Sequence, residues 1–400
     1  MIYLVLFLFF LFPIFFCDYK LWNYGNSYER GNIYQGYYIF LLVLVVLLFG
    51  LRNYVGGDTI GYMDMWKNIP FVSELPKFDF LHAKYQPFWY IFSSVCKSIT
   101  GKFWVFQIVH AAIVNSIIFY TISRYCQYRF TVIFIYAVAT MFYFNCEILR
   151  ESLSLSFGLL GLAYYNDKKW LPYYIFALIA LAFHKSATIL LFLPLLYKFT
   201  TTTINVRYLF LFIVVGFVFS TFLLDKIVVY LFPFFMKSFD KYSKMANATM
   251  LGNIRAVLIV CLLAYLLKCY ENTRDGKLKN AYVCAKFYLL MHILGLFLPI
   301  FTTRFSNYFE IFYIILLGDF IWNHYGAKKI LVCALYANFV FSVVKHQTRD
   351  VSDWVSSTSH GYYFYQRYYP YYSIFDDIPY GDLSHRKNIY YQERLNNLQR

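Results

Sequence analysis

The chain has 400 residues, of which 60% are hydrophobic and 14% are charged, whereas about 25% of the residues of a soluble domain are charged. A water-soluble globular fold is excluded, because it could not bury so much apolar surface. The formal net charge of +15 does not predict nucleic-acid binding, because the Lys and Arg residues lie between hydrophobic runs and form no basic domain.

Long apolar runs with short polar breaks predict an all-α fold, a polytopic integral membrane protein with about 10–12 transmembrane helices. A transmembrane barrel would need alternating apolar and polar residues, which these runs lack. Residues 1–16 are apolar and lack the basic leader and cleavage site of a secretory signal, so we expect a retained first helix there. Residues 86–99 are amphipathic, which favours an interfacial or re-entrant helix. The expected spans are residues 2–17, 37–51, 103–120, 130–144, 152–166, 171–183, 187–198, 207–222, 251–269, 281–300, 306–322 and 330–344.

Short loops rich in Lys and Arg fall on one face if segment 86–99 does not cross the membrane, and the positive-inside rule makes this face cytoplasmic. Residues 52–102 and 223–250 are then functional loops of the outer face. We expect residues 1–345 to form the transmembrane domain and residues 346–400 to form a tyrosine-rich extracytoplasmic tail. The basic residues of the inner face are Arg124, Arg129, Lys168, Lys169, Lys198, Arg207, Lys268, Arg274, Lys277, Lys279, Lys328 and Lys329.

The sequence contains no motif for a cofactor or a metal. Its eight cysteines are dispersed without a CxxC pair and are typical of small core residues. The HExxH, Walker, DxD and GxSxG motifs are also missing, which leaves metalloproteases, NTPases, metal-dependent nucleotide-sugar transferases and serine hydrolases without support. We therefore expect neither a cofactor nor a metal site, and no nucleic-acid partner.

The segment 51–66, LRNYVGGDTIGYMDMW, places a charged turn at the end of an apolar helix. An arginine grips phosphate with two hydrogen bonds, so Arg52 is a candidate phosphate ligand. Asp58 could orient that arginine or act as a base. The plainer alternative is an arginine that reaches the membrane interface, followed by an Asx turn.

Two further polar groups interrupt apolar runs on the same predicted outer face. In NCEILRE, residues 145–151, Glu147 and Arg150 lie three positions apart, where they either pair with each other on one helical face or serve a site. In FHKS, residues 183–186, His184 is suited to proton transfer near neutral pH, unless it only caps a helix.

Arg304, in TRFSN, adds a third helix-end arginine to Arg52 and Arg150 on the outer face. A pyrophosphate at the bilayer surface needs several cations, because the dielectric constant is low there. Since arginines on this face run against the positive-inside bias, they favour such a site. The tail reads GYYFYQRYYPYY at residues 361–372, and its rings either pack against sugars or form an interfacial aromatic belt.

These motifs, in their order along nearly the whole chain, resemble those of the EpsG family of Wzy-like bacterial exopolysaccharide polymerases. One departure is Glu151, which stands where the family often has Gln. The elements that resemble the family's motifs are RNYVGGDTIGY from Arg52 to Tyr62, Arg150 at the start of a small-residue helix, Phe-His-x-Ser at 183–186, Arg304, and Tyr369-Pro370-Tyr371.

The resemblance implies a multi-pass protein of the bacterial inner membrane that joins oligosaccharide repeat units into exopolysaccharide, capsule or O-antigen at its outer face. The units are carried on undecaprenyl pyrophosphate. Expected partners are this lipid-linked oligosaccharide, membrane lipid and assembly proteins such as a flippase or a chain-length regulator. The implied roles are pyrophosphate binding for Arg52, Arg150 and Arg304, base catalysis for Asp58, His184 or Glu147, and glycan contact for Tyr62, Tyr369 and Tyr371.

Other functions stay open from the residues alone. A flippase for lipid-linked oligosaccharide would place polar residues at mid-depth in the membrane, whereas the notable charges here lie at helix ends. A membrane O-acyltransferase would use His184 as its base and would need a second catalytic polar group beside it. A non-enzymatic membrane scaffold is the remaining alternative.

Overall fold

The computed structural model describes residues 2–24, 32–197, 250–273, 275–296, 301–324 and 363–399, with a few isolated positions between these ranges. The described residues form helices and no strand, apart from one isolated antiparallel bridge between Arg52 and Ser373. The predicted all-α class is confirmed. The predicted span 207–222 lies outside the described residues, as do nearly all of 223–250 and most of 330–344.

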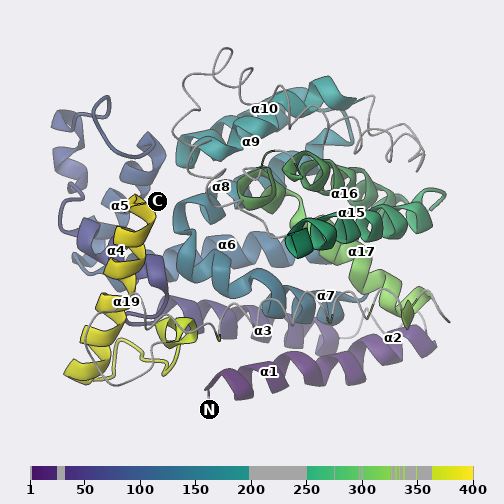
Figure 1. Ribbon diagram of the computed structural model, residues 1–400, viewed down its shortest axis with the longest axis horizontal. Coiled ribbons are helices and arrows are strands. Elements are labelled where there is room, and N and C mark those ends of the chain that lie inside the picture. Colours follow the sequence, from purple (N-terminus) through teal and green to yellow (C-terminus); the bar gives the residue numbers. More distant parts are fainter. Residues whose placement is uncertain are drawn as a thin grey trace.

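The helices α1, α3, α6, α9 and α15 run roughly along the long axis of the molecule, whereas α19 runs across it (Figure 1). The first predicted span continues beyond residue 17, because a π-helical turn joins α1 to α2. The bounds are α1 Ile2–Pro13, η1 Ile14–Asp18, α2 Tyr19–Tyr24, α3 Asn32–Gly50, α4 Gly57–Trp66, η2 Val72–Lys77, α5 Pro87–Thr100, α6 Phe103–Tyr125, α7 Arg129–Tyr136, η3 Ala137–Met141, η4 Tyr143–Glu147, α8 Leu149–Tyr165, α9 Trp170–Phe183, η5 Lys185–Ala187, α10 Thr188–Phe192, η6 Leu193–Leu196, α15 Met250–Tyr270, α16 Gly276–Gly295, η8 Phe301–Phe305, η9 Ser306–Tyr308, α17 Glu310–Asn323, η11 Phe364–Arg367 and α19 Tyr380–Gln399.

Several of these helices have the length and composition of membrane spans. Three qualify singly, and η8–η9 with α17 would form a fourth span that is bent by 71°. Shorter apolar helices accompany them, and the expected count of about 10–12 also includes segments outside the described residues. The single spans are Ile2–Asn23, Ile33–Gly50 and Phe103–Tyr125, and the shorter helices are Arg129–Met141, Trp170–Phe183, Lys185–Leu196 and Ala256–Tyr270.

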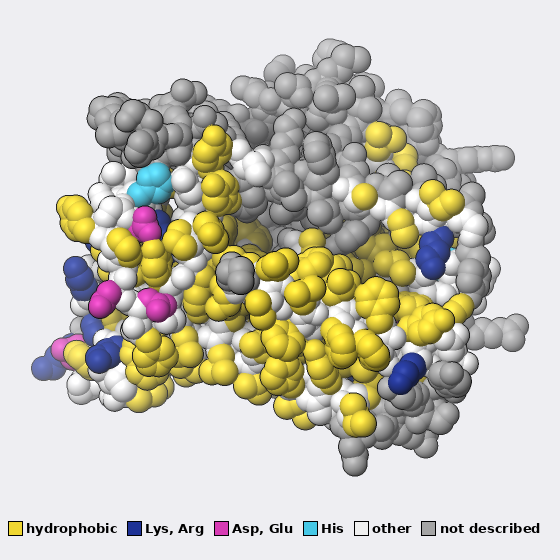
Figure 2. All heavy atoms as spheres, turned by 90° about the horizontal axis from the view of Figure 1, so that it is seen from below, with side chains coloured by type: hydrophobic (Ala, Val, Ile, Leu, Met, Phe, Trp, Pro, Cys, Tyr) yellow, Lys and Arg dark blue, Asp and Glu magenta, His cyan; other side chains and the backbone are white. Residues whose placement is uncertain are grey.

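The outward-facing side of these helices is apolar. Phe7 and Phe12 of α1 are exposed, as are Leu171 and Leu178 of α9. Figure 2, seen from the side of α1, shows hydrophobic side chains over the middle of the molecule and charged side chains gathered toward its two ends. A patch of this size is a liability in water, whereas lipid requires it of a spanning helix.

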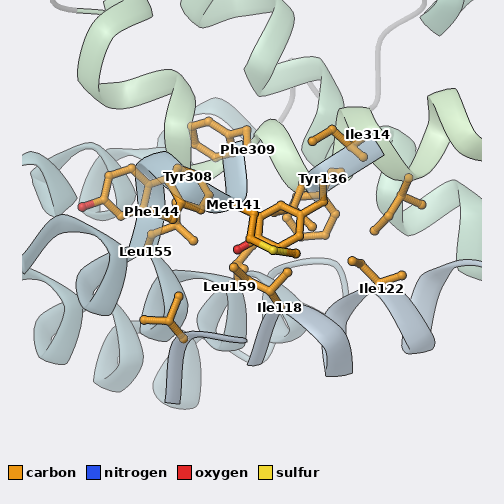
Figure 3. Packing of buried hydrophobic residues seen from close by; sticks show 14 of the residues in the cluster. Ile118, Ile122, Tyr136, Met141, Phe144, Leu155, Leu159, Tyr308, Phe309 and Ile314 are labelled. Carbon is orange, nitrogen blue, oxygen red and sulfur yellow. The ribbon is translucent and has the colours of Figure 1, made fainter. Parts of the chain in front are cut away.

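The core lies where α6, α8, the π-helical turns after α7 and the η9–α17 segment meet. Ile118 of α6, Met141 of η3 and Leu159 of α8 pack together there with Tyr308 and Phe309 (Figure 3). α8 is the central helix and contacts both α6 and α9. Its many Ser and Gly residues are small enough for the neighbouring helices to approach closely.

The two ends of α8 mark the two ends of the molecule. At its C-terminal end, Asn166 donates to the carbonyl oxygen of Asn280, 3.3 Å away, which joins the α8–α9 turn to the start of α16. At the opposite end α8 begins beside η4 and the segment of α4, α5 and α19, which lies at the left of Figure 1. The predicted basic turn at Lys168 and the predicted outer loop 52–102 therefore lie at opposite ends.

The predicted amphipathic segment 86–99 is a helix, α5. Its buried side includes Trp89 and Ser93, while Ile91 and Val95 are exposed. The outward stripe of α5 is thus apolar, as the surface of an interfacial helix would be.

Candidate functional site

Glu147, at the end of η4, connects the first motif to the rest of the molecule. Its Oε1 accepts a hydrogen bond from Gly57 N at 2.8 Å, and its Oε2 accepts one from Asp58 N at 3.0 Å. These are free amide groups at the start of α4, where a carboxylate also stabilises the helix dipole. Glu147 additionally accepts from Tyr368 OH and lies 3.7 Å from Arg367 Nη1.

The ion pair between Glu147 and Arg150, which the spacing allowed, is not formed. Ile148 lies between them with φ −104° and ψ 48°, outside helical geometry. The two side chains therefore leave the chain on different helices, η4 and α8, and do not share a face.

Arg52, the first residue of the first motif, has only 1% of its surface exposed. Its guanidinium donates to the carbonyl oxygen of Phe49, and Nη2 lies 3.4 Å from Thr59 Oγ1. The Arg52 backbone forms the bridge to Ser373 of the tail. The structure thus places Arg52 among protein partners that hold the turn, and its role as a phosphate ligand stays a prediction.

Arg150 occupies the first turn of α8. Its Cζ stacks 3.7 Å from the ring centroid of Tyr85, and its charge acts on the hydroxyl group of Tyr62. Tyr62 is 8% exposed. In the part of the chain that the structure describes, no carboxylate forms an ion pair with Arg150.

Arg304 reaches the same turn of α8 from η8. Its Nη1 donates to Glu151 Oε2 at 2.6 Å, and Asn307 Nδ2 donates to Glu151 Oε1 at 2.8 Å. The Glu151 side chain is 1% exposed, whereas that of Arg304 is 31% exposed. The sequence prediction did not include Glu151 among the site residues; its departure from Gln beside Arg150 was the available signal.

His184 follows α9 and lies near the charged groups at the start of α8. We call Arg150, Glu151, Arg304 and His184 the α8 cluster. Its Nδ1 lies 2.6 Å from Ser186 Oγ. Burial, together with the charges of Arg150, Arg304 and Lys185, lowers the pKa of His184 from its usual 6.5 to about 2. The imidazole is therefore neutral at physiological pH and surrounded by cations.

Tyr143 is a second residue that the sequence prediction missed. Its side chain is 36% exposed, and the charges of Arg304, Glu151, Glu147 and Asp58 all act on its hydroxyl group. Charges at the start of α8 and at the start of α4, where Asp58 is exposed, thus both act on Tyr143. Only its place in an aromatic run could have marked it, and many tyrosines of this chain share that feature.

The tail tyrosines divide into exposed and engaged groups. Tyr369 is 53% exposed, as an aromatic platform for sugar would be. Tyr371 instead donates to the carbonyl oxygen of Leu48 at 2.8 Å. The tail from residue 363 onwards is thus packed on the transmembrane part through some of its rings.

Fold and site together define a polytopic helical membrane protein with a cationic, histidine-containing site at one end of its helices. Within the described ranges, no group of three or more His, Cys, Asp or Glu side chains could hold a metal ion. The sequence model of the EpsG family matches residues 36–373, and the chain belongs to this family. Membership supports a role of the exopolysaccharide-polymerase type in general terms. No curated protein and no solved structure matches the chain.

Proposed function

We propose that the protein is a glycosyltransferase that polymerises oligosaccharide units linked to undecaprenyl pyrophosphate, at the outer face of the bacterial inner membrane. The observation that carries this proposal is Arg150, whose charge acts on His184 together with that of Arg304, and which forms no ion pair with a carboxylate in the described part of the chain. A guanidinium in this setting favours a bound anion.

The charge balance of the site supports an anionic ligand. Arg150, Arg304 and Lys185 all act on His184. Among the described residues, Glu151 offsets two of these cations, through its ion pair with Arg304 and its interaction with the charge of Arg150. The first turn of α8 adds unpaired backbone N–H groups and the positive end of the helix dipole. A pyrophosphate would add negative charge that balances the remaining cations.

The chemistry needs no nucleotide, because a sugar linked to pyrophosphate is already activated. The acceptor hydroxyl oxygen forms a bond to the anomeric carbon of the growing chain, and the bond from that carbon to the pyrophosphate oxygen breaks. The electron pair leaves with undecaprenyl pyrophosphate, whose charge Arg150 and Arg304 stabilise. The hydroxyl proton passes to a base, for which His184 and Asp58 are the accessible candidates.

The contacts of the other predicted site residues indicate different roles for them. Glu147 already accepts hydrogen bonds from two backbone amides and a phenol, which fits an anchor of the α4 turn better than a base. Arg52 and Tyr371 are engaged by backbone carbonyls in the same region, and we assign them to positioning. Tyr62 and exposed Tyr369 remain the proposed glycan contacts.

Reconstituted polymerisation tests this function. The protein in detergent or nanodiscs, supplied with undecaprenyl-pyrophosphate repeat units from its own strain, should produce a ladder of lengthened glycans. Arg150→Ala should lower the rate about 100-fold or more, because it removes stabilisation of the leaving group. Arg124→Ala is the matched control, since Arg124 is also an arginine at a helix end but lies in the last turn of α6.

Either of two outcomes would count against the proposal. Folded wild-type protein that makes no ladder from authentic substrate would exclude the polymerase and direct attention to flippase assays in vesicles. An Arg150→Ala variant that makes a wild-type ladder would show that the pyrophosphate does not bind at the start of α8.

A further inference from the structure

A chain of hydroxyl groups connects His184 to a backbone carbonyl deep between α8 and α9. Ser186 Oγ lies 2.6 Å from His184 Nδ1 and 2.9 Å from Tyr308 OH. Tyr308 OH lies 2.8 Å from Ser154 Oγ, which in turn donates to the Ala180 carbonyl oxygen at 2.6 Å. Ser154 and Tyr308 have no exposed surface.

The number of hydroxyl hydrogens in this hydrogen-bonded chain decides which group donates in each of its bonds. The Ala180 carbonyl only accepts, so it takes the hydrogen of Ser154. The contact between Ser154 and Tyr308 must then use the phenol hydrogen, and the contact between Tyr308 and Ser186 must use the hydrogen of Ser186. No hydroxyl hydrogen remains for the bond between Ser186 and His184. Nδ1 must therefore be the donor in that bond.

We propose that this chain holds His184 in the tautomer with its proton on Nδ1, so that Nε2 presents a lone pair and is the base that deprotonates the acceptor hydroxyl. Tyr308, Ser154 and Ser186 are positioning residues on this view. The inference rests on the proposed polymerase function for its catalytic part, whereas the tautomer itself is a property of the free protein.

One contact opposes this arrangement. The backbone N–H of Ser186 points toward His184 Nδ1 at 3.3 Å, and it would favour an unprotonated Nδ1. That tautomer would leave one hydroxyl contact of Tyr308, either at 2.8 or at 2.9 Å, without any hydrogen. Two buried oxygens at hydrogen-bond distance without a hydrogen cost more than one long N–H contact, so the Nδ1–H tautomer is favoured.

The surroundings of His184 Nε2 are those that a catalytic base requires. Nε2 has no hydrogen-bond partner among the described residues, and it is not fully enclosed. The ring is neutral, because burial and nearby cations keep the pKa of His184 low. An arriving pyrophosphate would offset those cations and make Nε2 a stronger proton acceptor.

The tautomer can be read directly by NMR on the full-length protein in nanodiscs, labelled with ¹⁵N-histidine. An imidazole nitrogen without a proton resonates far from one that carries a proton, and His184→Asn identifies the signals of His184. Wild-type protein should show a protonated Nδ1 and an unprotonated Nε2. A wild-type signal with the proton on Nε2 would overturn the inference, whatever the enzymatic activity.

Ser154→Ala tests the relay at a distance, since Ser154 does not contact His184. Without it, Tyr308 can donate to Ser186 and Ser186 to Nδ1, so the tautomer should change to the Nε2–H form. The polymerisation kcat should fall about 100-fold, the scale of general-base catalysis, with KM little changed. Ser156→Ala is the control, because the Ser156 hydroxyl only donates to the Ser152 carbonyl oxygen within α8.

The outcomes separate the inference from the proposed function. An unchanged tautomer in Ser154→Ala would refute the relay even if polymerisation slowed. A changed tautomer with wild-type kcat would refute His184 as the base while leaving the polymerase intact. Absence of polymerisation by the wild type would refute the function, and the tautomer would still be measurable.

Discussion

The roles of individual charged residues in this protein depend more on their surroundings than on their residue type. Glu147 and Glu151 are four positions apart, and both are buried. Glu147 binds the amide groups of α4, whereas Glu151 binds Arg304 and Asn307. Glu147 thus anchors a turn, whereas Glu151 belongs to the α8 cluster. Similar side chains acquire different functions because each has different partners.

At this scale the low pKa of His184 predicts a pH dependence of stability. In the unfolded chain a histidine gains a proton below about pH 6.5, whereas folded His184 stays neutral down to about pH 2. The unfolded state therefore binds more protons in this interval, and stability falls as the pH is lowered. Between pH 7 and pH 5 the wild type should lose about 2 kcal/mol more than His184→Asn.

Denaturant titrations of both proteins in the same mixed micelles, at the two pH values, would measure this difference. Parallel losses in the wild type and in His184→Asn would contradict a half-buried His184 that stays neutral in the folded protein. Comparison with the variant cancels the contributions of the other titrating groups.

Among the elements, the turn at the start of α4 shows why the first motif contains two adjacent glycines. Gly56 has φ +100°, a conformation that L side chains rarely adopt, and a Cβ there would lie 2.6 Å from Cys146 Cβ and 2.9 Å from Cys146 O. A Cβ on Gly57 would lie 2.2 Å from Arg367 Nη1. The glycines allow η4, the start of α4 and the tail to meet around Glu147.

Gly56→Ala should therefore destabilise the protein by about 2–4 kcal/mol, through backbone strain and overpacking against Cys146. Gly36→Ala is the control, since no atom lies within 4 Å of a Cβ at Gly36 in α3. That change should be neutral or stabilise by up to about 1 kcal/mol. Unfolding in detergent would measure both, and equal stabilities would show that the turn tolerates a side chain.

For the whole molecule, the separation of the outer loop from the basic turns predicts a topology. Leu81, in the loop before α5, is 93% exposed, and Gly276, at the start of α16, has open space around it. Leu81→Cys should react with a membrane-impermeant maleimide in intact cells. Gly276→Cys should react only after permeabilisation.

The labelling requires serine in place of the two exposed cysteines, Cys261 and Cys333. The opposite pattern would reverse the orientation and place the cationic site on the cytoplasmic side. Labelling of both positions in intact cells would show that the two loops share a face.

The amino-acid sequence alone determined the class of this protein, because hydrophobicity and helix formation depend on neighbouring residues. Apolar runs predicted the helices, and the positions of Arg150, His184 and Arg304 at helix ends predicted a charged site. The order of these motifs predicted the family, which the match over residues 36–373 confirmed.

Only the tertiary structure decided which of these residues meet. Arg304 binds Glu151 across 153 positions, and Tyr308 reaches Ser186 across 122 positions. No local pattern encodes such contacts, because they depend on how α8, α9 and the η8–η9 segment pack. The same packing buried Arg52 at the start of the first motif and left Arg150 without an ion-paired carboxylate among the described residues. The physical reason is that burial and pairing depend on residues distant in sequence, whereas the propensity to form a membrane helix is local.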